Sequence, residues 1–150
     1  MPIEKEKKLS RKLLEIILRH RFPVEVATKS RLVLRDLDLL KQIDKVAILP
    51  DDLKGILRGG TIVSHSISTL DEKLAKIFEP GAPLPIERLD TIRECKKEEL
   101  FAGVNIMPML PFLSDSYQYP YLYLTCFKLE DRRLIIFEPL SKLVFTTLLL

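Results

Sequence analysis

The chain has no tryptophan, only two cysteines and no apolar run long enough to cross a membrane. A membrane-spanning helix needs about 20 consecutive apolar residues, and polar or charged residues interrupt every apolar segment well before that length. The N-terminal segment is charged where a secretory signal peptide requires an apolar core. These absences predict a cytoplasmic protein without a membrane partner.

Metal-binding patterns are also scarce. Cys95 and Cys126 lie too far apart for a zinc site or an iron–sulfur loop, and two such cysteines are expected to be buried thiols. His20 has no partner at metal-ligand spacing. His65 alternates with Ser64 and Ser66, so its ring should face away from their hydroxyls. No metal ligands are therefore predicted among these residues.

The charge balance is nearly even, with 24 basic and 21 acidic residues, and its net value of +3 does not indicate nucleic-acid binding by itself. Basic residues do cluster in the first 21 positions. A solvated helix face explains this cluster more simply than a phosphate-binding patch, and nucleic-acid binding is kept as a weaker alternative. The hydrophobic share of 47% suits a single soluble domain with its own core.

Strand-like and helix-like segments alternate along the chain, which predicts an α/β fold with a parallel sheet. The expected strands are Val24 to Thr28, Lys45 to Leu49, Thr61 to Ser68 and Gly103 to Leu110. About four strands are too few for a closed eight-stranded (β/α) barrel, which needs ~200 residues or more, so we expect an arc of a larger barrel. The segment from Tyr117 onward is an apolar tail with strand-like alternation and no assigned role.

Helical spacing also predicts which side chains are buried. In residues 3–20 the expected apolar stripe is Leu9, Leu13, Ile16, Ile17 and His20. A later helix is expected to begin with a capping box formed by Thr69 and Glu72 and to bury Leu70, Leu74, Ile77 and Phe78. Pro85 suits the first position of the next helix.

Small polar clusters follow two of the expected strands. Lys29 comes directly after the first strand, and Ser66 and Ser68 lie on one face at the end of the strand from Thr61. The carboxyl ends of parallel strands are where ligands usually bind, and a lysine there can hold a carboxylate or phosphate. These residues predict an anion pocket, although a solvated lysine with capping hydroxyls explains them as well.

Four segments in order resemble the radical S-adenosylmethionine (SAM) proteins related to spore photoproduct lyase and DNA-repair photolyases. They are the sequence ATKS at 27–30, SIST at 66–69, EPG at 79–81 followed by Arg88, and GVNIMPMLPFLSD at 103–115. The resemblance implies that residues 1–116 form part of a radical SAM core. Residues 117–150 would then be a divergent tail.

The resemblance also implies a cofactor site. Lys29, Ser66 and Ser68 would contact the methionyl carboxylate or the ribose of SAM. The strand that contains Asn105 and Met107 would lie against the adenine. Glu79 and Arg88 are equally well explained by helix termination and a surface ion pair, so a structural role is preferred for them.

The family's cysteine loop, CxxxCxxC, is missing from the sequence. In the intact family its three thiolates hold a [4Fe-4S] cluster that reduces SAM to start radical chemistry. We therefore expect no catalytic residues and no turnover from this chain alone, which would be a truncated remnant or one part of a split protein. A homo-oligomer or a second chain could complete the barrel. The alternative is a non-catalytic α/β interaction protein that assembles through open sheet edges.

Overall fold

A five-stranded parallel sheet forms the centre of the molecule. The computed structural model describes residues 2–105, 136–137 and 146–149. The strands are β1 (Val24–Thr28), β2 (Thr61–Ser66), β3 (Phe101–Asn105), β4 (Ile136–Phe137) and β5 (Thr146–Leu149). Their order is β4-β3-β2-β1-β5, and every neighbouring pair is parallel. The predicted α/β class with a parallel sheet is confirmed.

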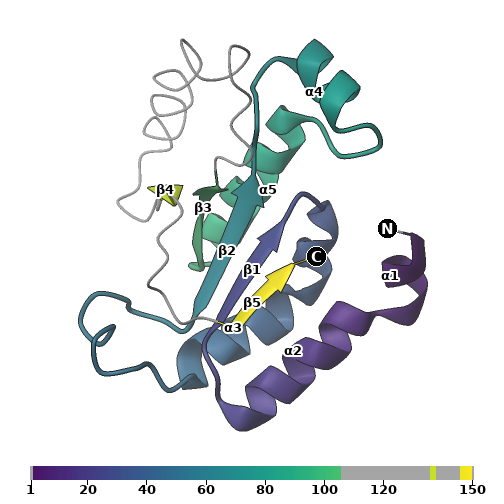
Figure 1. Cartoon of the computed structure of the whole chain (residues 1–150). Helices are drawn as coiled ribbons and strands as arrows, with labels where there is room; N and C mark the ends of the chain where they lie inside the picture. The colour runs from purple at the N-terminus through teal and green to yellow at the C-terminus, as the bar shows by residue number, and fades with distance from the viewer. Residues whose placement is uncertain (1, 106–135, 138–145, 150) are drawn as a thin grey trace.

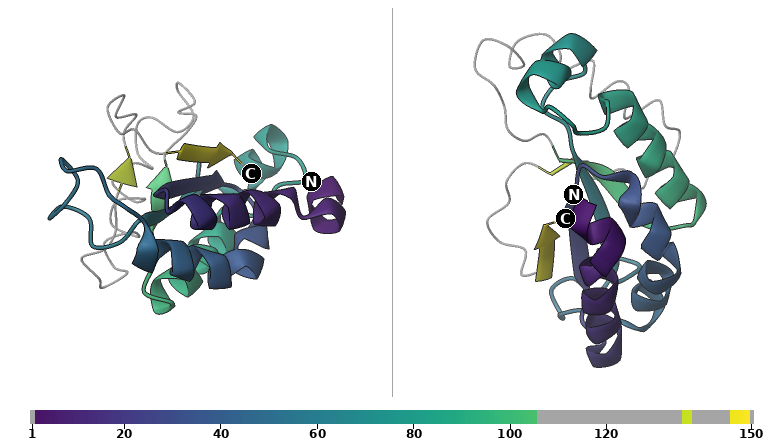
Figure 2. Two further views of the ribbon diagram at one scale, coloured as in Figure 1. Left: turned by 90° about the horizontal axis from the view of Figure 1, so that it is seen from below. Right: turned by 90° about the vertical axis from the view of Figure 1, so that its right-hand side faces the viewer.

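The long helices lie on one face of this sheet (Figure 2). The helices are α1 (Pro2–Lys7), α2 (Leu9–His20), the 3-10 helix η1 (Arg31–Asp36), α3 (Leu37–Val46), α4 (Glu72–Phe78) and α5 (Pro85–Lys97). Helices α2, α3 and α5 cover the same side, whereas α4 lies beyond the carboxyl ends of the strands (Figure 1). Strands β1, β2 and β3 are neighbours in the sheet in the same order as in the chain.

Strand register separates an apolar face from a partly polar one. Val26 pairs with Val63, which pairs with Ala102, and all three belong to the main core under the helices. Because side chains alternate along a strand, Glu25, Ser64 and Asn105 lie on the opposite face. There the Ser64 hydroxyl donates to the Glu25 carboxylate at 2.9 Å. The sheet thus has an apolar face that packs against the helices and an opposite face that carries hydrogen-bonding side chains.

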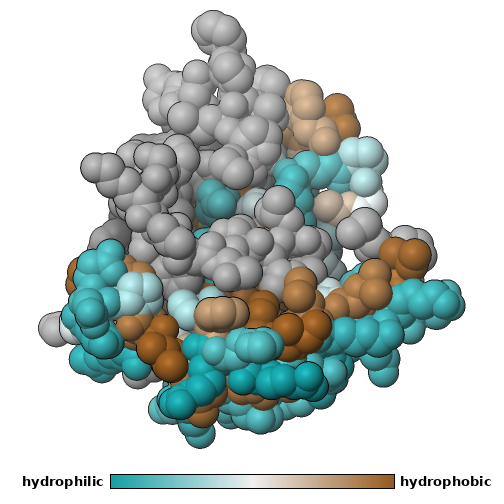
Figure 3. Space-filling model, turned by 60° about the horizontal axis from the view of Figure 1, so that its bottom comes forward, coloured by the Kyte–Doolittle hydropathy of each residue, from teal (hydrophilic) through white to brown (hydrophobic). Residues whose placement is uncertain are grey.

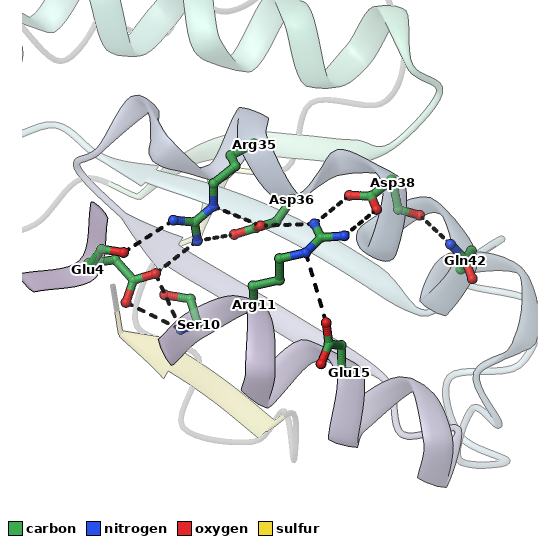
Figure 4. A network of polar contacts seen from close by, with 8 residues as sticks. All are labelled: Glu4, Ser10, Arg11, Glu15, Arg35, Asp36, Asp38 and Gln42. Atoms are coloured by element: carbon green, nitrogen blue, oxygen red, sulfur yellow. Dashed lines mark hydrogen bonds and ion pairs between the residues drawn. The ribbon is translucent and has the colours of Figure 1, made fainter. Parts of the chain in front are cut away.

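Helices α1 and α2 are fixed to the rest of the molecule by an ion-pair network (Figure 4). At its centre is Asp36, whose side chain is only 2% exposed. Asp36 accepts from Arg11 of α2 at 3.2 Å and from Arg35 at 2.6 Å. Arg35 also donates to Glu4 of α1 at 2.8 Å, and Arg11 donates to Asp38. Arg11 also pairs with Glu15 of its own helix, so two arginines shared among four carboxylates hold the N-terminal helices against η1 and α3.

Several expected elements differ from those observed. The expected strand from Lys45 to Leu49 is wrong, because α3 continues to Val46 and the next residues have no regular structure. The β2 strand ends at Ser66, two residues earlier than expected, and the Ile67 amide still donates to the Asn105 carbonyl at 2.9 Å. The expected strand from Gly103 begins earlier, at Phe101, and residues 106–110 lie outside the described residues.

The buried side of the N-terminal helix also differs from the expectation. The helix expected over residues 3–20 is divided at Lys8, which has a left-handed backbone with φ 51°. Leu14 and Ile17 are buried, whereas Leu9, Leu13 and Ile16 are 54, 42 and 50% exposed. Apolar residues cover more than one face of α2, and only one of those faces meets the sheet. The other apolar face is in solvent.

The start of α4 differs as well. Asp71, and not Thr69, caps this helix by accepting from the amides of Lys73 and Leu74. Ile77 and Phe78 are exposed instead of buried. By contrast, α5 begins at Pro85 as predicted. The segment 117–150 supplies β4 and β5, which pair with β3 and β1 at the two edges of the same sheet.

Candidate functional site at the carboxyl edge of the sheet

The predicted site residues lie at the same edge of three neighbouring strands. Thr28, the last residue of β1, pairs with His65, and Ser66 at the end of β2 pairs with Asn105 at the end of β3. Lys29 directly follows Thr28, so it lies at the same level as Ser66 and Asn105. The structure therefore brings these three positions to one edge, as the sequence predicted. Met107 lies outside the described residues.

The carboxylate of Glu79 connects the segments at this edge. Its Oε1 atom accepts from the Lys29 ammonium at 2.8 Å and from the Ser68 hydroxyl at 2.8 Å. Its Oε2 atom accepts from the Arg88 guanidinium. Glu79 follows α4, whereas its three donors come from the end of β1, the loop after β2 and α5. One carboxylate thus joins four parts of the chain.

Arg88 connects the same network to the backbone of neighbouring segments. Its side chain is 1% exposed, and it donates to the Ser66 carbonyl at 2.8 Å and to the Pro83 carbonyl at 2.9 Å besides Glu79. The predicted interpretation of Glu79 and Arg88 as a surface ion pair is wrong, since Glu79 is only 8% exposed. The sequence contained a signal for this burial. Arg88 is four residues before Ile92 and seven before Cys95, so all three lie on the buried face of α5.

The network carries one excess positive charge, because two cations share one carboxylate. Burial opposes ionisation of Glu79, but the hydrogen bonds from Lys29, Arg88 and Ser68 outweigh it and lower the pKa of Glu79 below its usual value. The Lys29 side chain remains 38% exposed. An ammonium has three N–H groups, so Lys29 keeps donors for a further acceptor. The site is suited electrostatically to an anion.

A cavity of about 810 Å³ borders this network. Lys29 lies on its wall together with its neighbours Thr28 and Ser30. The rest of the wall comes from η1, from residues 80–83 and from five residues of α1 and α2, namely Glu4, Lys5, Leu9, Ser10 and Leu13. This volume is in the range of small-molecule sites, which usually combine apolar walls with a few polar groups. Ser66, Ser68 and Asn105 do not line the cavity, so only Lys29 among the predicted residues links it to the network.

His65 lies on the opposite side of β2 from Ser64 and Ser66, as the alternation predicted. Its side chain is fully buried, and within the described part of the chain neither ring nitrogen has a hydrogen-bond partner. Burial, with a smaller contribution from the positive charge of Arg88, lowers the pKa of His65 to about 4. The imidazole is therefore neutral at neutral pH and belongs to the core beneath the network.

Thiol chemistry has little support at this site. Cys95 is fully buried in α5, as expected, and burial raises the pKa of its thiol to about 12. Cys126 lies outside the described residues. Among residues 2–105 and the two short edge strands, no group of three His, Cys, Asp or Glu side chains could hold a metal ion. Within the same residues, no helix has the length and apolar character needed to cross a bilayer.

Comparisons with known proteins give two curated relatives. The chain is 38% identical over 102 residues to the uncharacterized protein ORF301 of Acidianus two-tailed virus, an alignment that covers 68% of this chain and 29% of that protein. It is 31% identical over 114 residues to the uncharacterized protein MJ0683 of Methanocaldococcus jannaschii, covering 76% of this chain and 38% of that protein. The chain thus spans about a third of each relative. No family model matches it, and no solved structure does.

We predict that Arg88→Met destabilises the fold strongly. Removing the guanidinium leaves the buried Glu79 carboxylate and the Ser66 carbonyl without a principal donor, and breaking a buried ion pair in this way costs about 3–5 kcal/mol. Urea unfolding measures the loss. The matched control on the same helix is Arg93→Met, which breaks an exposed pair with Asp90 and should change stability little. Equal effects of the two substitutions would show that the Glu79 network does not stabilise the edge.

We also predict that His65 makes stability pH-dependent. The folded-state pKa is about 4 and the unfolded value about 6.5, so between these values the unfolded chain binds a proton that the folded chain excludes. The free energy of unfolding should therefore fall by about 3 kcal/mol as pH decreases from 6.5 to 4. Unfolding at several pH values should show that His65→Leu removes this part of the slope. Parallel profiles for the two proteins would contradict the assignment.

Proposed function

We propose that this chain is the SAM-binding part of a radical SAM barrel of the type found in spore photoproduct lyase and DNA-repair photolyases. The observation that carries the proposal is the position of the Lys29 ammonium. It lies at the carboxyl end of β1, is fixed by Glu79 and borders a cavity of ligand size. A ligand carboxylate could take the remaining Lys29 donors, and the excess positive charge of the network favours it.

The arrangement of strands supports a barrel arc. Strands β1, β2 and β3 are adjacent in chain order, and the helices that connect them lie on one face of the sheet. Successive units of a (β/α) barrel have this arrangement, whereas a doubly wound sheet has helices on both faces. The partly polar opposite face, with Glu25 and Ser64, corresponds in this proposal to the inside of the barrel. Its carboxyl edge is the side on which barrel enzymes bind their ligands.

The other predicted residues have supporting roles in this proposal. Ser68 donates its hydroxyl hydrogen to Glu79, so it orients the carboxylate that holds Lys29. Ser66 lies beside Lys29 at the strand ends but does not line the cavity, so a SAM molecule held by Lys29 would reach the Ser66 hydroxyl only by extending over the edge of the sheet. Asn105 is the neighbouring position on β3 and would lie nearer the adenine. The lysine is therefore the residue expected to determine affinity for the carboxylate.

The residues of this chain do not fit the family's [4Fe-4S] cluster. Three iron atoms of such a cluster need thiolate ligands, and the sequence holds two cysteines. Cys95 is buried in α5, and burial raises the pKa of its thiol to about 12. This disfavours the thiolate that would bind iron. The proposal for these 150 residues is therefore limited to SAM binding, and lyase or DNA-repair chemistry is proposed for the intact family alone.

The non-catalytic alternative, assembly through open sheet edges, stays a prediction. In the described part of the sheet the edge strands are β4 and β5, and β5 pairs along β1 over four residues. The edge of β1 is thus occupied by a segment of the same chain, and in the described part of the sheet assembly through an edge would use β4 or β5.

We predict that Lys29→Ala weakens SAM binding by at least about tenfold, because a charge-assisted hydrogen bond contributes about 1.5–3 kcal/mol. Calorimetry should compare SAM with 5′-methylthioadenosine, which has the adenosine and the sulfur but no carboxylate. The substitution should weaken SAM and leave methylthioadenosine unchanged. The matched control is Lys73→Ala, an exposed lysine on α4. Equal SAM affinity in wild type and Lys29→Ala would refute the site.

We further predict that anaerobic reconstitution with iron and sulfide yields no stoichiometric cluster. Iron and acid-labile sulfide analysis, together with absorbance near the thiolate-to-iron bands, measures the cluster content. Treating Cys95→Ala in parallel tests whether any bound iron depends on the buried thiol. Four irons per monomer in the wild-type chain would contradict the donor count, whatever the outcome of the SAM titration.

A further inference from the structure

The exposed face of α2 is an apolar row that the rest of the described chain leaves largely in solvent, and two of its members, Leu9 and Leu13, also form part of the rim of the 810 Å³ cavity. Leu9, Leu13 and Ile16 are spaced four and three residues apart, and each is at least 42% exposed. Phe22, 56% exposed, continues this row because its ring stacks on His20 with centroids 6.0 Å apart. We call these residues, Leu9, Leu13, Ile16 and Phe22, the outer α2 row. The space-filling view shows apolar atoms next to hydrophilic ones along this side of the molecule (Figure 3).

Basic residues border this row. On a helical wheel Lys12 and Arg19 lie directly beside Leu9 and Ile16, on the side away from the core. Both are exposed, as are Lys5 and Lys8. Residues 1–21 contain seven lysines and arginines against three glutamates, a net charge of +4. Since the whole chain carries +3, the remaining residues carry −1. The N-terminal segment is therefore the basic part of the sequence; Arg11 within it is paired with Asp36 and Asp38, whereas Lys12 and Arg19 are exposed beside the row.

We propose that the outer α2 row and its flanking lysines dock onto an anionic lipid surface. An amphipathic helix with aliphatic and aromatic residues on one side and lysines or arginines beside them lies in the membrane interface, with its apolar side inserted and its cations at the headgroups. The α1–α2 region has both features on the same exposed side. The ion pairs of Asp36 with Arg11 and Arg35 hold this region on the domain, so the row is presented in a fixed orientation.

Charge complementarity favours this occupant over the other candidates. A second copy of the chain would place two basic regions against each other. A nucleic acid would use the lysines and leave the aliphatic side chains in water, since its backbone offers them no apolar surface. A lipid surface of negative charge satisfies both sets of residues. The expectation of no membrane partner rested on the absence of a long apolar run, a criterion that applies to spanning segments and not to a helix lying on a lipid surface. Leu9, Leu13 and Ile16, which were expected to be buried, are exposed.

Sedimentation with vesicles tests the proposal. The full chain should bind vesicles of equal parts phosphatidylglycerol and phosphatidylcholine, and pure phosphatidylcholine vesicles should bind at least about tenfold more weakly. Raising the salt concentration from 0.1 to 0.5 M should weaken binding further. Absence of binding to the anionic vesicles at low salt would overturn the proposal.

Two double variants separate the apolar and the basic contributions. Leu13→Ser with Ile16→Ser should reduce partitioning about tenfold or more, because each buried methylene contributes about 0.8 kcal/mol. Lys8→Gln with Lys12→Gln should reduce it about 30-fold, at ~1 kcal/mol per cation. The matched controls are Ile56→Ser with Ile77→Ser, and Lys73→Gln with Lys76→Gln, which change exposed residues elsewhere. Thermal unfolding verifies that each variant is folded.

Two results would replace the lipid surface with another occupant. If light scattering shows an oligomer that the Leu13/Ile16 variant dissociates, and vesicles do not bind, the row is a contact between copies. If a DNA duplex binds the chain and only the Lys8/Lys12 variant weakens that DNA binding, the basic residues form a nucleic-acid contact. Either result overturns the proposal. Loss of vesicle binding in both test variants, with the controls unchanged, supports it.

Discussion

The carboxyl edge of the sheet depends on one carboxylate. Glu79 accepts from Lys29, Ser68 and Arg88, and through them it ties the end of β1, the loop after β2 and α5 to the segment after α4. A buried anion is stable only when its lone pairs are satisfied, and a buried arginine only when its charge is balanced. Each of these groups therefore makes the burial of the others possible.

This dependence limits how the edge can act on a ligand. Arg88 has three acceptors within the protein, so it supports the edge and has little capacity left for a ligand. Lys29 differs, because it is partly exposed and borders the cavity. An ammonium fixed by Glu79 loses less side-chain entropy on binding than a free surface lysine does. The network thus prepares one cation for an incoming anion and keeps the other in the structure.

The sequence was sufficient for the features that depend on local pattern. The β1 segment, the start of α5 at Pro85 and the shared level of Lys29, Ser66 and Asn105 follow from alternation, proline geometry and parallel pairing. It was insufficient where several faces were equally apolar. In α2, Leu13 and Leu14 are adjacent leucines that point in different directions, and only the packing of the helix against α3 and the core decides which is buried. The same limit explains the error at Ile77 and Phe78, since α4 lies beyond the carboxyl ends of the strands and not over the apolar face of the sheet (Figure 1).

Net charge was misleading for a related reason. A value of +3 over 150 residues describes a nearly neutral protein, yet it is the sum of a strongly basic N-terminal region and a slightly acidic remainder. Electrostatic attraction to a surface depends on the charges within about a Debye length of it, ~8–10 Å at moderate salt. The exposed lysines near α2 therefore act on a neighbouring surface largely without compensation from distant carboxylates. Excluding a charged partner requires the positions of the charges, and here the structure places them beside exposed leucine and isoleucine side chains.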